Sequence, residues 1–315
     1  MQVKMISVIV LTYKNGDFLL ETIDSILKQS YSAIELIIAE DGDPKFDSKK
    51  ITNYIENNKR DNIVRYNVRS NDKNLGTVKN INIAIDQSNG EYIKIIAGDD
   101  VYPSSSVFEK QISYLEKNED LQIVVGRIQE CDNDAKPLKT YIKKLDYDLI
   151  KHNDLKSIKK IVKKQPELLS TQSMCFRRTF FEKYGKYDEN LVLIEDLPMM
   201  LRIIMKQIPV EFDDNISINH RGQVGVSNDS KVIDKTKLRY YLDLQYYFGT
   251  LLMEYKEILG RIYVVNHYQM ARFRVDSIQS DRLCILKYLP DLLIYSLCNA
   301  HRVGQHFFRK IIGRK

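Results

Sequence analysis

Short apolar runs rich in β-branched residues alternate along the chain with segments in which apolar residues recur at every third or fourth position. The apolar runs cover residues 6–12, 34–39, 63–68 and 92–97. Most of them are continuous, which is typical of strands buried on both faces of a parallel sheet. The segments with helical spacing cover residues 17–28, 48–58 and 78–87. This alternation predicts an α/β fold with a mostly parallel, Rossmann-like sheet flanked by helices.

The alternation becomes less regular after the first hundred residues. We expect a helix over 105–117 and a strand over 122–126, followed by a polar stretch. A long tyrosine-bearing helix is expected over 236–260, with two further helices after it. A chain of 315 residues has room for one large α/β domain and a smaller appendage. We therefore expect an α/β domain at 1–230 and a helical C-terminal extension at 231–315.

Cysteine usage and apolar segments indicate a cytoplasmic protein that is not integral to a membrane. The cysteines lie far apart, without a Cys-x-x-Cys pair or a zinc-like spacing, at Cys131, Cys175, Cys284 and Cys298. The N-terminus enters an apolar run at once and shows no secretion signal. The longest apolar stretch, 283–298, is interrupted by charged residues and a proline, and it is shorter than the roughly 20 residues that span a bilayer.

The net charge of +6 is modest but unevenly distributed. Lysines concentrate at 143–164, and the basic ending 307–315 also carries two phenylalanines. Such an ending favours contact with an anionic membrane surface, and a solvated terminal helix is the alternative. Nucleic acid is not expected as a partner, because no zinc finger, RNA-recognition or basic-zipper signature accompanies the charge.

Two adjacent carboxylates, Asp99 and Asp100, directly follow the apolar run 92–97. The carboxyl end of a buried strand is where an open α/β sheet binds its ligand. Carboxylates suit Mg²⁺ and Mn²⁺, which often bring a phosphorylated partner. The pair therefore indicates a seat for a metal and a diphosphate, although Gly-Asp-Asp is also ordinary turn chemistry.

Other polar residues should reach the same crevice. Thr12 and Tyr13 end the first expected strand, and Asp41 follows the second, where it is placed to accept a hydrogen bond from a base or a ribose, or simply to reverse the chain. Glu195 and Asp196 precede an expected helix. Asp196 is either the N-cap of that helix or a general base that activates an incoming hydroxyl, and the two roles are compatible.

Several of these segments occur together in a familiar order. They are Ser7–Tyr13, Ile37–Gly42, Asn74–Gly76, Gly90–Ile93, Gly98–Asp100 and Glu195–Asp196. With them the chain resembles a family 2 glycosyltransferase of the GT-A fold, over roughly residues 5 to 230. The resemblance implies an inverting enzyme that uses a nucleotide-diphospho-sugar.

The resemblance also implies roles for single residues at the donor. It places the base near Thr12, Tyr13 and Asp41, with Asp41 bonded to it. Lys79 matches a basic position close to the nucleotide, and Asp99 is expected near the ribose.

Further roles concern the metal and the acceptor. Asp100, beside Asp99, is expected to hold Mn²⁺ or Mg²⁺ on the diphosphate. Glu195 and Asp196 match the acidic pair near the acceptor, with Asp196 as the base.

The sequence departs from the commonest family pattern at a few positions. Ala97 stands where many relatives have an aspartate, which weakens the expected metal site. Leu11 and Asp43 replace a frequent proline and a frequent serine. The segment His220-Arg221-Gly222, followed by Gly225 and Ser227, is similar to a late arginine and serine segment of the family. His220 or Arg221 is placed there to touch the diphosphate, and a surface loop is the favoured alternative for His220.

The resemblance, together with the basic ending, implies transfer of a sugar from a UDP-sugar to a hydroxyl acceptor, which we expect to be a lipid-linked glycan in the synthesis of a surface polysaccharide such as a capsule. Two alternatives stay open, a nucleotidyltransferase and a non-catalytic nucleotide-sugar-binding or scaffolding protein. Residues 12–16 are poor in glycine for a nucleotidyltransferase phosphate loop. The tyrosine-bearing segment 238–255 either faces a sugar or packs in a core or a homo-oligomer contact, and packing is favoured.

Overall fold

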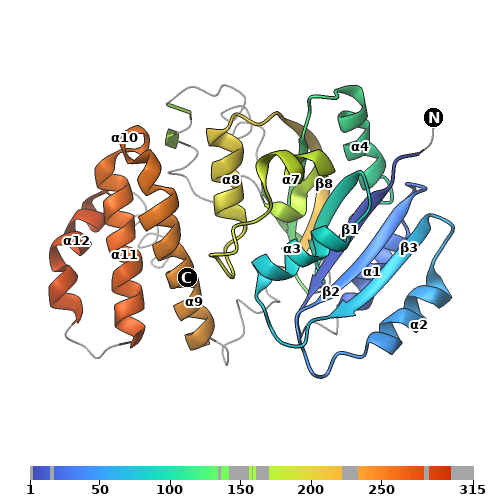
Figure 1. Cartoon of the computed structure of the whole chain (residues 1–315), viewed down its shortest axis with the longest axis horizontal. Helices are drawn as coiled ribbons and strands as arrows, with labels where there is room; N and C mark the ends of the chain where they lie inside the picture. Colours follow the sequence, from blue (N-terminus) through green and yellow to red (C-terminus); the bar gives the residue numbers. More distant parts are fainter. Residues whose placement is uncertain are drawn as a thin grey trace, which may run out of the picture. The chain divides into compact units, whose positions relative to one another are not determined.

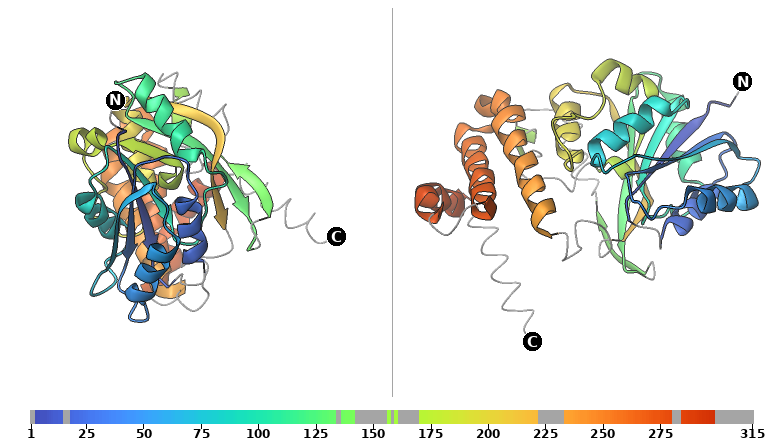
Figure 2. Two further views of the ribbon diagram at one scale, coloured as in Figure 1. Left: turned by 90° about the vertical axis from the view of Figure 1, so that its right-hand side faces the viewer. Right: turned by 60° about the horizontal axis from the view of Figure 1, so that its bottom comes forward.

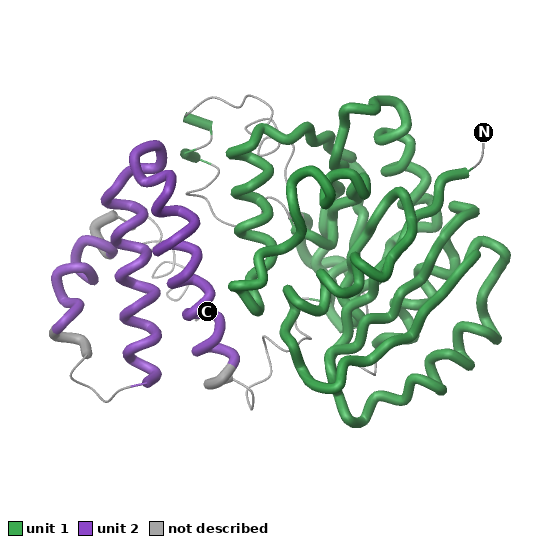
Figure 3. The backbone as a smooth tube through the Cα atoms, in the orientation of Figure 1, with its two compact units in different colours: residues 1–232 green, residues 233–315 purple. Residues whose placement is uncertain are grey.

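A computed structural model describes residues 3–14, 18–133, 136–141, 156–157, 159–160, 170–221, 233–279 and 284–298. Two compact units make up the chain, Met1–Val232 and Ile233–Lys315 (Figure 3). Most of the lysine-rich segment 143–164 and all of the basic ending 307–315 lie outside the described residues.

The first unit is built on one mixed, mostly parallel sheet in the order β3-β2-β1-β4-β7-β5-β6, with β8 paired to β5 (Figure 1). Its strands are β1 Ile6–Thr12, β2 Ile34–Glu40, β3 Ile63–Ser70, β4 Tyr92–Ala97, β5 Ile123–Cys131, β6 Pro137–Tyr141, β7 Met174–Arg177 and β8 Val210–Arg221. The first four strands are parallel, as their apolar runs predict. The later strand β7 runs antiparallel to both β4 and β5.

Helices flank both faces of this sheet (Figure 2). They are α1 Leu19–Leu27, α2 Ser48–Asn58, α3 Thr77–Gln87, α4 Val107–Lys117, α7 Arg178–Tyr184 and α8 Asp196–Met205, with a short 3₁₀ turn η1 at Thr171–Ser173. Val8 and Val10 pack on the same side as the apolar residues of α1, α2 and α4. Because side chains alternate along a strand, Ile9 faces the opposite side, where α3 contacts β1 and β2. The fully apolar strands are therefore buried on both faces.

The second unit is helical, and its first helix differs from expectation. Its elements are α9 Ile233–Tyr246, a π-helical turn η2 Tyr247–Leu251, a 3₁₀ turn η3 Met253–Tyr255, α10 Lys256–Leu259, α11 Arg261–Gln279 and α12 Cys284–Cys298. The single helix expected over 236–260 is wrong, because the chain changes to a π-helical turn at Tyr247. There Gly249 packs so closely on Tyr268 that an added Cβ would lie 2.6 Å from its ring.

The two helices expected after residue 260 are present as α11 and α12. The described helices include none with the length and apolar character needed to cross a membrane.

Candidate active site

Side chains from several elements line one cavity of about 170 Å³ at the carboxyl ends of β1, β2 and β4. The lining residues are Leu11, Thr12, Tyr13, Asp41, Thr77, Asn80, Ile81, Ile95, Ala97, Thr171, Gln172 and Glu195. The cavity thus joins expected donor residues with one member of the expected acidic pair. Asp99 and Asp100 follow Ala97 in the chain but are not part of this lining.

The strand register explains why the donor side of the cavity forms. Leu11 of β1 lies opposite Ala97 of β4, and Thr12 lies opposite Glu40 of β2. The Asp41 amide then donates to the Thr12 carbonyl at 3.0 Å, and the Gly98 amide donates to the Leu11 carbonyl at 2.7 Å. Parallel strands of matched length therefore end at the same level.

Asp41 is buried and anchors the loop that precedes α3. Its carboxylate accepts hydrogen bonds from the Asn71 side-chain amide and from the backbone amides of Leu75 and Gly76, each at 2.9 Å. Three of its roughly four acceptor positions are therefore occupied by this loop. Asp41 positions the start of α3 at the cavity wall.

Glu40, rather than Asp41, organises the turn after β2. The Glu40 carboxylate accepts from the backbone amides of Gly42 and Asp43 at 2.8 and 2.7 Å. Gly42 has a φ of +81°, and a Cβ there would lie 2.2 Å from the Lys73 backbone. Only glycine lets the two loops approach this closely.

Asp100 is fully buried and bonded to β8. Its carboxylate oxygens lie 3.1 and 3.0 Å from His220 Nδ1, and the Arg221 amide donates to it at 2.9 Å. The hydrogen bond to Asp100 raises the pKa of His220, against the opposing effect of burial. The favoured surface-loop placement of His220 is wrong, since β8 continues to Arg221 and pairs along its length with β5.

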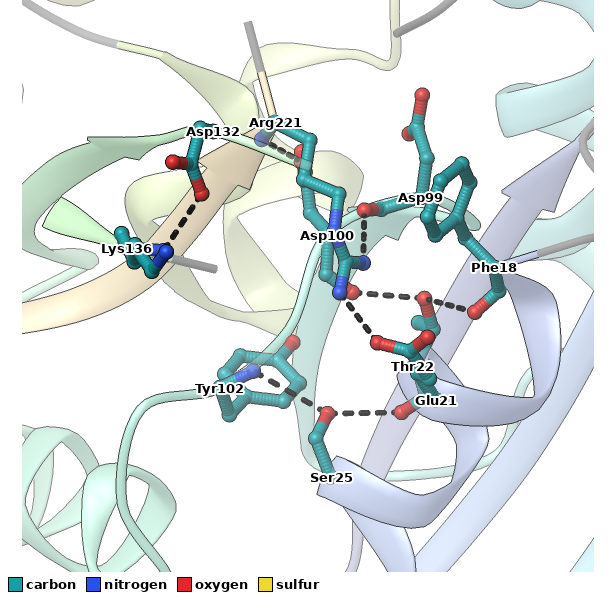
Figure 4. A network of polar contacts seen from close by, with 10 residues as sticks. All are labelled: Phe18, Glu21, Thr22, Ser25, Asp99, Asp100, Tyr102, Asp132, Lys136 and Arg221. Atoms are coloured by element: carbon teal, nitrogen blue, oxygen red, sulfur yellow. Dashed lines mark hydrogen bonds and ion pairs between the residues drawn. The ribbon is translucent and has the colours of Figure 1, made fainter. Parts of the chain in front are cut away.

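Arg221 ties the Asp99-Asp100 turn to the start of α1, as Figure 4 shows. Its guanidinium donates to the Asp99 carbonyl at 2.8 Å, forms an ion pair with Glu21 and lies 4.6 Å from the centre of the Phe18 ring. Neither Glu21 nor Phe18 was expected at the site. Gly222, Gly225 and Ser227 lie outside the described residues.

Asp99 carries an unfavourable charge. Burial, together with the neighbouring Asp100, raises the pKa of Asp99 to about 6. A carboxylate in such a place favours a cationic or hydroxyl-bearing partner when it is ionised.

The acidic pair lies at the start of α8. Glu195 occupies the N-cap position and lines the cavity, and Asp196 is the first helical residue. The N-cap expectation for Asp196 is therefore wrong. Its carboxylate instead accepts from the Thr171 amide at 2.7 Å, across to η1. Burial raises the pKa of Asp196, while hydrogen bonds from Thr171 and Ser170 oppose that rise.

Some lining residues were missed, and four expected site residues, Lys79, Asp99, Asp100 and Asp196, are not among those that line the cavity. Lys79 is exposed on α3 and does not line the cavity, whereas its neighbours Thr77 and Asn80 do. Asn80 is a buried polar residue on the inward face of an amphipathic helix, which is a signal that the sequence offered. Thr171 and Gln172 carried no such signal, because η1 is only one turn long.

Comparison with known proteins agrees with this architecture. The sequence model of the family described as "Glycosyl transferase family 2" matches residues 7–185. An uncharacterized glycosyltransferase of Methanocaldococcus jannaschii is 27% identical over 219 residues, covering 69% of this chain and 70% of that protein. Another, from Haemophilus influenzae, is 30% identical over 168 residues, covering 52% of this chain and 64% of that protein.

Two solved structures share the fold. The mannosyltransferase PcManGT from Pyrobaculum calidifontis, in complex with GDP-Man and Mn²⁺, superposes with a TM-score of 0.57 at 13% identity, covering 96% of this chain and 84% of that one. Residues 1–349 of S. aureus TarS, in complex with UDP-GlcNAc, give a TM-score of 0.56 at 14% identity, covering 95% and 92%. The family match over more than half of the sequence, on a GT-A type sheet, shows that the chain belongs to glycosyl transferase family 2.

Proposed function

We propose that this glycosyltransferase moves a sugar, with inversion, from a nucleotide-diphospho-sugar to a hydroxyl acceptor, and that the donor is a UDP-sugar. The observation that carries the proposal is the single cavity that brings Thr12, Asp41 and Glu195 together at the ends of the parallel strands. Nucleotide-sugars bound to fold neighbours, UDP-GlcNAc in TarS and GDP-Man in PcManGT, support this choice of donor class.

The charge of the cavity wall indicates which parts of the donor bind at the cavity and which bind near the Asp99-Asp100 turn. Two of the lining residues, Asp41 and Glu195, are acidic, and no lysine, arginine or histidine is among the described lining residues. Such a wall suits the uncharged nucleoside and sugar, and it repels phosphate. The diphosphate is therefore assigned to the side of Asp100, His220 and Arg221.

We propose that a divalent metal binds on that second side. Asp100 and His220 offer a carboxylate and an imidazole 3.0 Å apart, a donor set that Mn²⁺ accepts. In the ranges that the structure describes, no three His, Cys, Asp or Glu side chains are grouped to hold an ion by themselves. Ions at nucleotide sites are commonly held by one or two protein ligands together with phosphate oxygens. The bound metal would neutralise charge on the leaving diphosphate.

Asp196 is proposed as the general base. The acceptor oxygen attacks the anomeric carbon, its proton passes to the Asp196 carboxylate, and the bond from that carbon to the diphosphate oxygen breaks. Burial makes Asp196 more basic than an exposed aspartate, which suits proton acceptance. Glu195 lines the cavity beside it and is proposed to hold a hydroxyl of the sugar or the acceptor.

A lipid-linked glycan acceptor at a membrane surface is the further part of the proposal. Among the residues of α12 whose burial the structure describes, Leu289, Leu293 and Ile294 are exposed apolar side chains. The sequence after α12 ends in the basic stretch 307–315. Apolar and basic groups together favour an anionic lipid surface. Deleting 307–315 should lower co-flotation with anionic vesicles, and unchanged flotation would contradict this part.

The direct test is a panel of UDP- and GDP-sugars incubated with Mn²⁺ and an alcohol acceptor, with and without a chelator. We expect chelator-sensitive release of the nucleoside diphosphate and a product of inverted anomeric configuration. Release of a sugar 1-phosphate, with the nucleoside monophosphate transferred to the alcohol, would indicate a nucleotidyltransferase instead. Saturable binding of nucleotide-sugars without any release would indicate a binding or scaffolding protein.

A further inference from the structure

Gln172 presents a side-chain amide to the cavity in a defined orientation. It lies on η1 and lines the cavity together with Ala97. Its Oε1 accepts a hydrogen bond from the Ala97 backbone amide at 3.2 Å. A backbone N–H can only donate, so the amide oxygen must face Ala97 and the Nε2 group must face the other way.

In the described ranges, the N–H donors of Gln172 Nε2 are unused, whereas the side-chain amide of Asn80, which also lines the cavity, is bonded within the protein. Asn80 donates from Nδ2 to the Ala39 carbonyl, and its Oδ1 accepts from Arg69 and Asn71. Within the part of the chain that the structure describes, no acceptor is bonded to Gln172 Nε2. A half-buried amide with two unused N–H donors is suited to a ligand oxygen.

The backbone that carries Gln172 is held from the sheet side. The buried Lys94 ammonium donates to the Met174 carbonyl at 3.3 Å and to Gln111 Oε1 at 2.6 Å. Gln111 Nε2 in turn donates to the Ser173 carbonyl at 3.2 Å. The residues directly after Gln172 are thus fixed by a polar cluster inside the first unit.

The same turn is held from the α8 side. The Thr171 amide donates to Asp196, and the Thr171 hydroxyl lies 3.2 Å from the Tyr187 hydroxyl. Restraints on both sides of Gln172 preorganise its amide, and preorganised contacts contribute more to selective binding than mobile ones.

We propose that Gln172 is a donor-recognition residue, whose Nε2 group donates a hydrogen bond to an uncharged oxygen of the bound nucleotide-sugar. This inference rests on the proposed function. The oxygen belongs either to the base or to the sugar, and both offer carbonyl or hydroxyl acceptors. With Asp41 and Glu195 on the same wall, a carboxylate-bearing sugar is disfavoured, so the substrate class is a nucleotide-sugar with an uncharged sugar.

The test compares Gln172→Glu and Gln172→Ala with wild type by calorimetric titration of UDP and of UDP-sugars. Gln172→Glu keeps an oxygen for the Ala97 amide and a nearly unchanged volume, but it removes the N–H donors and adds a third negative charge. We expect the dissociation constant of the donor to rise about tenfold or more for Gln172→Glu and about three- to tenfold for Gln172→Ala. The control is Gln87→Glu at the exposed end of α3, for which we expect no change.

The two ligands identify the oxygen. A loss already seen with UDP assigns the contact to the nucleoside, and a loss seen only with UDP-sugars assigns it to the sugar. Thermal unfolding of each variant within a degree or two of wild type ensures that binding, and not folding, is compared. Unchanged affinities in both variants, with a wild type that binds and turns over the donor, would overturn the role of Gln172 and leave the proposed function standing. A wild type that binds no nucleotide-sugar would overturn both.

Discussion

The donor half of the first unit, residues 3–100, and its catalytic half, the described residues from 101 to 221, are assembled in different ways. In residues 3–100, contacts that build the cavity join consecutive strand and helix repeats, and Asp41 bonds to residues 34 and 35 positions away. In the later half, His220 reaches Asp100 across 120 positions and Arg221 reaches Glu21 across 200. The donor half therefore depends on contacts between consecutive strand and helix repeats, and the catalytic half depends on a few polar contacts that span 120 positions or more.

Because the two halves are built differently, we expect substitutions in one half to affect stability and donor binding, and substitutions in the other to affect the reaction. Changes at Asp41 should act on loop position and stability, because its partners are the loop residues that precede α3. Changes at Asp196 or His220 should act on the reaction, because both lie at the junction between distant segments.

Asp196→Asn should abolish most turnover while the donor still binds. The amide cannot accept the proton of the attacking hydroxyl, and a positioned base contributes about 10²- to 10⁴-fold to rate. Transfer rates and calorimetric titration of the donor measure the two effects separately. Glu182→Gln, exposed on α7, serves as the control. Near-normal turnover in Asp196→Asn would reject Asp196 as the base.

Asp41→Ala should destabilise the donor half and weaken donor binding. It leaves the amides of Leu75 and Gly76 without their acceptor, at a cost of about 3 kcal/mol in the free energy of unfolding. Urea unfolding measures the change, with Asp43→Ala in the same turn as the control. Equal stability of the two variants would contradict the anchoring role of Asp41.

His220→Ala should weaken metal binding without unfolding the protein. The Mn²⁺ concentration for half-maximal turnover should rise about tenfold or more, since even outer-shell partners of metal ligands contribute about 10- to 100-fold to metal affinity. Asn215→Ala, exposed on the same strand, is the control. An unchanged Mn²⁺ response in His220→Ala would remove His220 from the metal site.

Asp99→Asn should change how stability depends on pH. The folded-state pKa of Asp99, about 6, lies above the ordinary 3.8, so between these values the folded protein binds the proton more tightly than the unfolded chain. Stability contributed by that proton is lost as pH rises through 6, by about 1 kcal/mol between pH 5 and pH 7.5. The wild-type minus variant difference in unfolding free energy isolates this loss. The same slope in wild type and Asp99→Asn would contradict the raised pKa, and exposed Asp120→Asn should leave the slope unchanged.

The sequence allowed most of the donor half to be predicted, because its signals are local. The helix expected over 48–58 and the strand over 92–97 have the expected ends, since apolar spacing within each segment determines its burial. Strand β5 extends to Cys131, five residues beyond the expected end, because pairing with β8 lengthens it. That pairing also places His220 on a strand, which the local sequence pattern around His220 does not predict.

The sequence did not predict the contacts that residues make with distant partners, even where it named the residue, as it did for Arg221. Arg221 gains its position from Glu21 and Phe18, and Gln172 gains its orientation from the Ala97 amide. The break after α9 depends on the close contact between Gly249 and Tyr268, which lie on different elements. Such contacts cannot be predicted from local sequence patterns, because they depend on how distant segments fold together.

The proposed function depends on donor binding in the cavity at the ends of β1, β2 and β4. A single fluorophore at the cavity wall tests that binding most directly. The chain has no tryptophan, so Tyr13→Trp places one indole at the cavity wall with no background signal. We predict saturable quenching of this indole by the UDP-sugar that the enzyme turns over, and no change in a Tyr184→Trp control on α7. A donor that is turned over by Tyr13→Trp but leaves its fluorescence unchanged would contradict the assignment of the cavity.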